Sequence, residues 1–214
     1  MRFIFVLSFL FYWSAISYSQ IDSHEVWLDS KQEYKLNKKL DLSLNESFRS
    51  RISPFSAKSL IIELSAEYEI SKVFKTGLKF RHGIKLNNNA DIDRISIYLR
   101  AKERYKKFNF SWRGQYQREY ESFESFDSNF IRNKFSISYS RKKIDFKPSL
   151  FFEIFYNPNH SVYHWDQRRL GGGMEYALNK KQSITAKCFI KNALNESRWK
   201  RTIVYRLSYS IELN

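Results

Sequence analysis

Apolar and polar residues alternate one for one in about ten segments of this chain, which is the period of a β-strand with two different faces. The clearest segment covers residues 40–49. A helix would mix the two sets of residues, because its period is 3.6 residues. Each segment has about the ten-residue length with which a tilted strand crosses a bilayer. The apolar face of this first clear segment consists of Leu40, Leu42, Leu44 and Phe48.

The connections between the segments alternate in length. Short ones lie near residues 37–39, 71–73, 106–107, 142–143 and 179–181, and longer polar ones cover 50–58, 87–92, 121–129, 157–164 and 192–198. Short turns at one end and long loops at the other are typical of barrels in the bacterial outer membrane. The sequence therefore predicts an all-β fold: an up-and-down antiparallel transmembrane β-barrel of about 10 to 12 strands.

The number of strands depends on the weak first segment, residues 26–36. Including it gives about eleven strands, whereas single-chain bacterial barrels normally have an even number. Its more apolar face carries the polar Ser30 and Gln32. We therefore expect this segment to be short or only partly inserted, which leaves a ten-stranded wall from Leu40 onward that closes without a parallel seam.

The first nineteen residues have the pattern of a signal peptide. Arg2 precedes an apolar run from Phe3 to Trp13, and Ser17, Tyr18 and Ser19 form a small-x-small cleavage site. This run is too short to span a membrane as a helix. We expect residues 1–19 to direct export and to be removed, and residues 20–214 to form a single domain in the outer membrane.

The chain is strongly basic, with a formal net charge of +15 at pH 7, and 18% of its residues are aromatic. Cations beside aromatic rings also characterise proteins that bind nucleic acids. Here the rings and the cations fall on opposite faces of the same strands, as expected when one face meets lipid and the other a wet lumen. We therefore expect outer-membrane lipid as a partner and no nucleic acid. The single Cys188 excludes an intramolecular disulfide.

Charged residues on the polar faces predict a lumen that is lined by ion pairs. The register that keeps lipid-facing residues together sets Glu63 opposite Arg81, Arg94 opposite Glu119 and Arg132 opposite Glu153. It also sets Arg100 opposite Arg113. This last pair of like charges needs an anion, water or a third residue nearby. Because cations exceed carboxylates, the lumen favours small anionic solutes. The predicted lumen residues are Arg49, Glu63, Lys75, Lys79, Arg81, Arg94, Arg100, Lys102, Arg113, Glu119, Arg132 and Glu153.

Catalytic or cofactor chemistry has little support in the sequence. Three glycines, residues 171–173, lie within a strand pattern and lack the helix and the Lys-Ser or Lys-Thr pair of a phosphate loop. We expect them to bend the wall and Gly171 to leave room for Phe189. The weak catalytic candidates are His160, His164 and Asp166 in one polar loop. Their spacing is not specific for a metal site, and we expect no cofactor and no metal.

Four short phrases also carry a resemblance to a known family: residues 26–28 (VWL), 34–40 (YKLNKKL), 68–72 (YEISK) and 205–209 (YRLSY). In these phrases the chain resembles a family of Gram-negative outer-membrane β-barrels known only as a domain of unknown function. The resemblance covers nearly the whole chain after residue 19. It implies the location and the fold, and it supplies no catalytic or binding residue.

Three classes of function remain open at this stage. The first is an outer-membrane barrel with a structural role or passive solute passage, biased toward small anions. The second is an outer-membrane enzyme that acts on lipid or lipopolysaccharide, for which the loop from Ser161 to Asp166 is the first place to look. The third is a secreted soluble barrel that binds an apolar ligand, which requires apolar residues inside and polar residues outside. The sequence does not give the oligomeric state.

Overall fold

The computed structural model describes residues 21–214 except 88–89, 122–123, 141–144, 160–163 and 195–199. Within these residues no helix is long and apolar enough to cross a membrane. The eleven strands of the described chain are β1 (Ser23–Lys35), β2 (Leu40–Arg51), β3 (Ser56–Glu69), β4 (Phe74–Lys85), β5 (Ala90–Tyr105), β6 (Phe108–Glu121), β7 (Glu124–Tyr139), β8 (Phe146–Tyr156), β9 (Trp165–Ala177), β10 (Gln182–Ala193) and β11 (Arg201–Glu212).

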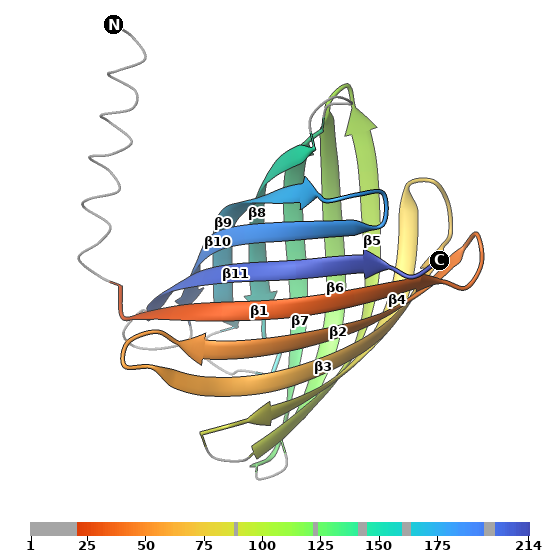
Figure 1. Cartoon of the computed structure of the whole chain (residues 1–214). Helices are drawn as coiled ribbons and strands as arrows, with labels where there is room; N and C mark the ends of the chain where they lie inside the picture. The colour runs from red at the N-terminus through yellow and green to blue at the C-terminus, as the bar shows by residue number, and fades with distance from the viewer. Residues whose placement is uncertain (1–20, 88–89, 122–123, 141–144, 160–163, 195–199) are drawn as a thin grey trace, which may run out of the picture.

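These strands form one closed barrel in which each strand pairs with the next along the chain. Ten of the junctions are antiparallel, and β1 closes the barrel by pairing in parallel with β11. In Figure 1, β1 lies directly beside β11 along the whole seam. The predicted all-β, up-and-down barrel is therefore confirmed.

The expectation of a ten-stranded wall is wrong, because β1 is a complete strand of 13 residues. It pairs with β2 on one side and with β11 on the other, so the barrel has a parallel seam. Contacts inside the barrel join the two seam strands. The Arg206 guanidinium donates to the Asp29 carboxylate at 2.6 Å, and the hydroxyls of Ser23 and Thr202 lie 2.9 Å apart. The polar outer residues that weakened the sequence pattern of β1 do not interrupt its backbone pairing.

Side chains alternate between the two surfaces of the barrel wall. The apolar rows point outward: Leu64 is 54% exposed and Ile97 is 52% exposed. The polar rows point inward, where Gln117 and Ser96 are buried. This arrangement is the opposite of the one that a soluble barrel with an apolar cavity requires.

The predicted short turns at 37–39, 71–73, 106–107 and 179–181 agree with the structure, and the one at 142–143 lies outside the described residues. The predicted long loops 50–58, 87–92 and 121–129 extend too far. The strands β3, β5 and β7 already begin at Ser56, Ala90 and Glu124. Backbone pairing continues there, as the register of Ile84 with Asp91 shows. The alternating pattern in the sequence ends earlier because, at these strand ends, polar residues occupy both faces of the strand. The apolar outer residues form a belt that does not reach the strand ends.

Gly171 fills the predicted role of making room for a ring. It lies on the inner face between Phe151 of β8 and Phe189 of β10. The rings of Phe151 and Phe189 are 5.6 Å apart, and Phe189 contacts Trp27 of β1 edge to face at 5.4 Å. Together with Val204 of β11, these side chains form a small apolar core inside the barrel beside the seam.

The close approach at Gly171 predicts a large cost for a single added carbon. An ideal Cβ at Gly171 would lie 2.2 Å from Cβ of Phe189, whereas one at Gly83 would lie no closer than 3.4 Å to any neighbour. We expect Gly171→Ala to lower the free energy of unfolding by about 2 kcal/mol or more, because overpacking forces the sheet to shift. Gly83→Ala is the matched control and changes it little. Urea titrations of the refolded protein measure both, and equal effects would contradict the packing role.

Candidate functional site: a basic cavity inside the barrel

The barrel encloses a polar cavity of about 520 Å³, to which every strand of the described chain contributes. Its volume lies in the range of sites for small molecules. Among the described residues that line it, twelve are basic and eight are acidic. The cavity forms because period-two alternation on a closed sheet directs every second side chain to the interior.

Most of the predicted lumen residues meet in this cavity. Lys75 and Lys102 lie outside its lining. Lys75 pairs instead with Asp41 at 3.2 Å and with Glu67 at 3.5 Å. The predicted residues that line the cavity are Arg49, Glu63, Lys79, Arg81, Arg94, Arg100, Arg113, Glu119, Arg132 and Glu153.

Glu63 of β3 is one centre of the ion-pair network. Lys79 Nζ donates to its carboxylate at 2.8 Å, and Arg81 Nε donates to the other oxygen at 2.9 Å. The predicted register of Glu63 opposite Arg81 is confirmed. Glu119 pairs in the same way with Arg94, which lies opposite on β5 as predicted.

Glu153 of β8 is the second centre, and its side chain is only 3% exposed. Arg132, Arg169 and Arg113 place guanidinium nitrogens 2.8, 3.4 and 3.5 Å from its oxygens. The predicted register of Arg132 opposite Glu153 is wrong. Lys134 lies opposite Glu153, and Arg132 lies opposite Phe155. Arg132 reaches Glu153 diagonally while its guanidinium stacks 4.5 Å from the Phe155 ring centre.

The predicted pair of like charges, Arg100 opposite Arg113, is confirmed. Other residues neutralise the two charges, and each arginine has a carboxylate of its own. Arg100 bonds Glu67 at 3.0 Å on β3, whereas Arg113 turns to Glu153 on β8. Each arginine therefore pairs with a carboxylate two strands away. Ion pairs of this kind cross part of the lumen, whereas pairs between neighbouring strands follow the wall.

Three cavity-lining cations form no ion pair with any residue that the structure describes: Arg49, Lys134 and Lys187. Arg49 stacks on the Trp27 ring at 4.0 Å, and Lys134 lies 4.5 Å from the Phe151 ring centre. Arg206 of β11 lies close enough to all three to repel them electrostatically. The cavity thus contains a group of cations, here called the basic cluster (Arg49, Lys134, Lys187 and Arg206), in which only Arg206 has a carboxylate partner.

Sequence reasoning missed Trp27, Lys134, Lys187, Arg169 and Arg206 as parts of this cavity. The signal was present, because each belongs to the inward row of its strand. Lys187, for example, lies two residues from the inward Phe189 on β10. The omission of Trp27 follows from the expectation that β1 was not a full strand.

The weak catalytic candidates do not form a common site among the described residues. His160 lies outside the described residues, and His164 stacks on Tyr156 with ring centres 5.4 Å apart. Asp166 lines the cavity. His82 points outward and lies 2.8 Å from the Asp93 carboxylate. In the described part of the chain, no three His, Cys, Asp or Glu side chains are grouped to hold a metal ion.

Comparison with known proteins gives a family but no activity. A family model described as a protein of unknown function, DUF2490, matches residues 24–202, from the second residue of β1 to the second residue of β11. The chain belongs to this family. A search of the curated proteins finds no match. The family agrees with the resemblance inferred from the sequence phrases as a domain of unknown function, and its description gives no location in the cell.

Glu153 allows a direct test of the ion-pair network. We expect Glu153→Gln to lower the free energy of unfolding by about 3 kcal/mol or more, because the buried Glu153 carboxylate is the shared partner of three guanidinium groups whose side chains are at most 21% exposed. The matched control is Glu175→Gln, whose ion pair with Lys147 has side chains 38% and 44% exposed and contributes little. Urea unfolding in vesicles compares the two. A Glu153→Gln effect as small as that of the control would contradict the network.

Proposed function

We propose that this protein is an integral outer-membrane β-barrel whose basic cavity binds small anions and passes them across the membrane. The observation that carries the proposal is the basic cluster. Every described carboxylate that lines the cavity has a partner. Arg49, Lys134 and Lys187 line the same cavity and have no carboxylate partner among the described residues. Cations without counterions in a site of this size attract and retain anionic solutes.

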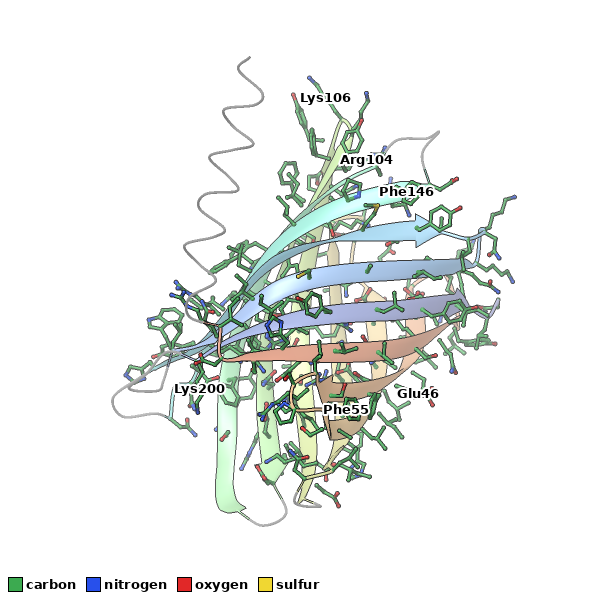
Figure 2. The ribbon with its side chains drawn as sticks, turned by 60° about the vertical axis from the view of Figure 1, so that its left-hand side comes forward. Glu46, Phe55, Arg104, Lys106, Phe146 and Lys200 are labelled. Atoms are coloured by element: carbon green, nitrogen blue, oxygen red, sulfur yellow. The ribbon has the colours of Figure 1, made fainter. Side chains whose placement is uncertain are left out.

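The outer surface supports the placement in a membrane. Figure 2 shows side chains over the outside of the wall, and the exposed ones include many large apolar residues. An apolar area of this extent on a monomer indicates contact with lipid rather than with water. Outward aromatic rings also lie at the ends of strands next to the short turns, where amphipathic rings meet headgroups. These rings are Tyr68, Phe74, Tyr105, Phe108, Tyr139 and Tyr176.

The charges of the interior support a preference for anions over cations or neutral solutes. Glu63, Glu119 and Glu153 each bond at least one guanidinium group and are therefore neutralised. Two cations of the basic cluster, Arg49 and Lys134, lie over the rings of Trp27 and Phe151, which carry no formal negative charge. The ion pairs that cross the lumen narrow the path, so we expect small anions such as phosphate or carboxylates and a low conductance.

Membrane insertion has a simple test. We expect the protein to remain with the membrane fraction after washing with carbonate or urea. On a gel, the unboiled barrel should migrate differently from the boiled chain, because a closed barrel resists detergent until heated. Release into the soluble fraction together with unchanged migration would contradict the placement in a membrane.

Anion selectivity has its own test in planar bilayers under a salt gradient. We expect a small conductance whose reversal potential favours anions. The triple variant Arg49→Gln, Lys134→Gln and Lys187→Gln should lose this preference, because it removes the unpaired charge of the cavity. The control triple, Lys38→Gln, Lys72→Gln and Lys180→Gln, removes the same charge from exposed turns and should keep it. Cation selectivity, or no conductance in the wild-type protein, would overturn the proposal.

A further inference from the structure

Polar side chains interrupt the apolar outer surface beside the parallel seam. Ser30 and Gln32 point outward from β1, and Glu46 points outward from β2 opposite Ser30. Figure 2 shows Glu46 projecting from the outside of the wall. Glu46 lies between the outward Leu44 and Phe48 on its own strand and opposite Ile62 of β3. We call Ser30, Gln32 and Glu46 the seam patch.

The seam patch has no polar partner in the part of its own chain that the structure describes. None of its three side chains makes a hydrogen bond or an ion pair with a residue that the structure describes. Other outward charges near the loop end are engaged, as in the 2.8 Å contact between His82 and Asp93. In a bilayer an unpaired carboxylate, amide and hydroxyl within the apolar belt are unfavourable. The patch is therefore explained best by an occupant that supplies polar groups.

The surface at the patch is hollow. An apolar groove of about 590 Å³ runs over the outer faces of β1, β2, β3, β10 and β11, and both Ser30 and Glu46 line it. The groove forms because the small Ser30 lies among the larger Leu28, Phe48 and Tyr209. Small residues that let two backbones approach, combined with polar residues, are the features of contact surfaces between membrane-embedded chains.

We propose that the seam patch is the interface between two copies of this protein in the membrane. This proposal rests on the membrane placement in the proposed function and does not depend on the anion selectivity. The patch contains both halves of a polar contact: donors in the Gln32 amide and the Ser30 hydroxyl, and an acceptor in the Glu46 carboxylate. A two-fold axis through the patch sets the donors of the first copy against the acceptor of the second. The same axis sets the donors of the second copy against the acceptor of the first.

This self-complementarity favours a second copy over a different partner or a lipid. The headgroup of an anionic phospholipid or of lipopolysaccharide carries phosphates, which a carboxylate repels. A partner with a single Lys or Arg would neutralise Glu46 but would leave the amide of Gln32 unused. Two copies related by a two-fold axis satisfy the carboxylate and the amide together, and each groove then receives apolar side chains from the other copy.

The first experiment measures the oligomeric state of the full chain, reconstituted in lipid nanodiscs or vesicles, by native mass spectrometry and by dilution. We expect the wild type to be a dimer. Glu46→Leu removes both acceptors of the interface and should weaken dimerisation by about ten-fold or more. Glu46→Gln keeps an acceptor oxygen and should remain dimeric. The control Glu103→Leu removes an outward carboxylate at the short-turn end of β5 and should also remain dimeric.

The second experiment locates the contact by cross-linking in a Cys188→Ser background. We expect Ser30→Cys to form disulfide-linked dimers in membranes, whereas Ile97→Cys, which is 52% exposed on the outside of β5, should not. A monomer that is integrated in the membrane and shifts on heating overturns this interface while the membrane placement stands. Dimers linked through Ile97→Cys, or links from Ser30→Cys only to another protein, also overturn it. A soluble protein would overturn both.

Discussion

Closure of the hydrogen-bonded sheet is the constraint on which the rest of this structure depends. A strand at an open edge leaves a row of backbone groups unpaired, which is unfavourable in lipid. Here β1 and β11 remove the last two edges by pairing with each other over eleven residues. Once the sheet is closed, the alternation of side chains has a single consequence: every second residue is outside the cylinder and the remainder are inside it. The apolar belt and the polar cavity both follow from that division.

The contents of the cylinder follow from charge. Many cations directed into a small volume would repel one another and oppose closure, and the carboxylates of Glu63, Glu119 and Glu153 offset that repulsion. Pairs that reach over an intervening strand, such as Arg113 with Glu153, connect the wall across the lumen. On the seam side the same space is filled by the rings of Trp27, Phe151 and Phe189. The ion-paired carboxylates and Trp27 both line the cavity that contains the basic cluster.

The sequence predicted the fold class, the short turns and most of the cavity, because all three depend on the period-two pattern that any strand with one apolar face shows. It failed where another requirement replaced that pattern. On β1 the outward Ser30 and Gln32 hid a strand whose pairing is set by backbone bonds and by inward contacts such as that of Asp29 with Arg206. Near Glu153 the register of β7 with β8 differs from the predicted one. There Arg132 lies opposite Phe155 and packs on its ring, a contact that charge alone does not indicate.

The measurement that tests this account most directly is the accessibility of spin labels attached at consecutive positions of β3 in membranes, in a Cys188→Ser background. Labels at Leu64 and Ala66 should be relaxed by oxygen dissolved in the lipid, and a label at Ser65 should be relaxed by a water-soluble nickel complex. This alternation is expected because Leu64 and Ala66 face outward and Ser65 faces the lumen, where its hydroxyl lies 2.7 Å from that of Ser43. Equal access of the nickel complex to all three positions would contradict a barrel that separates lipid from a polar interior.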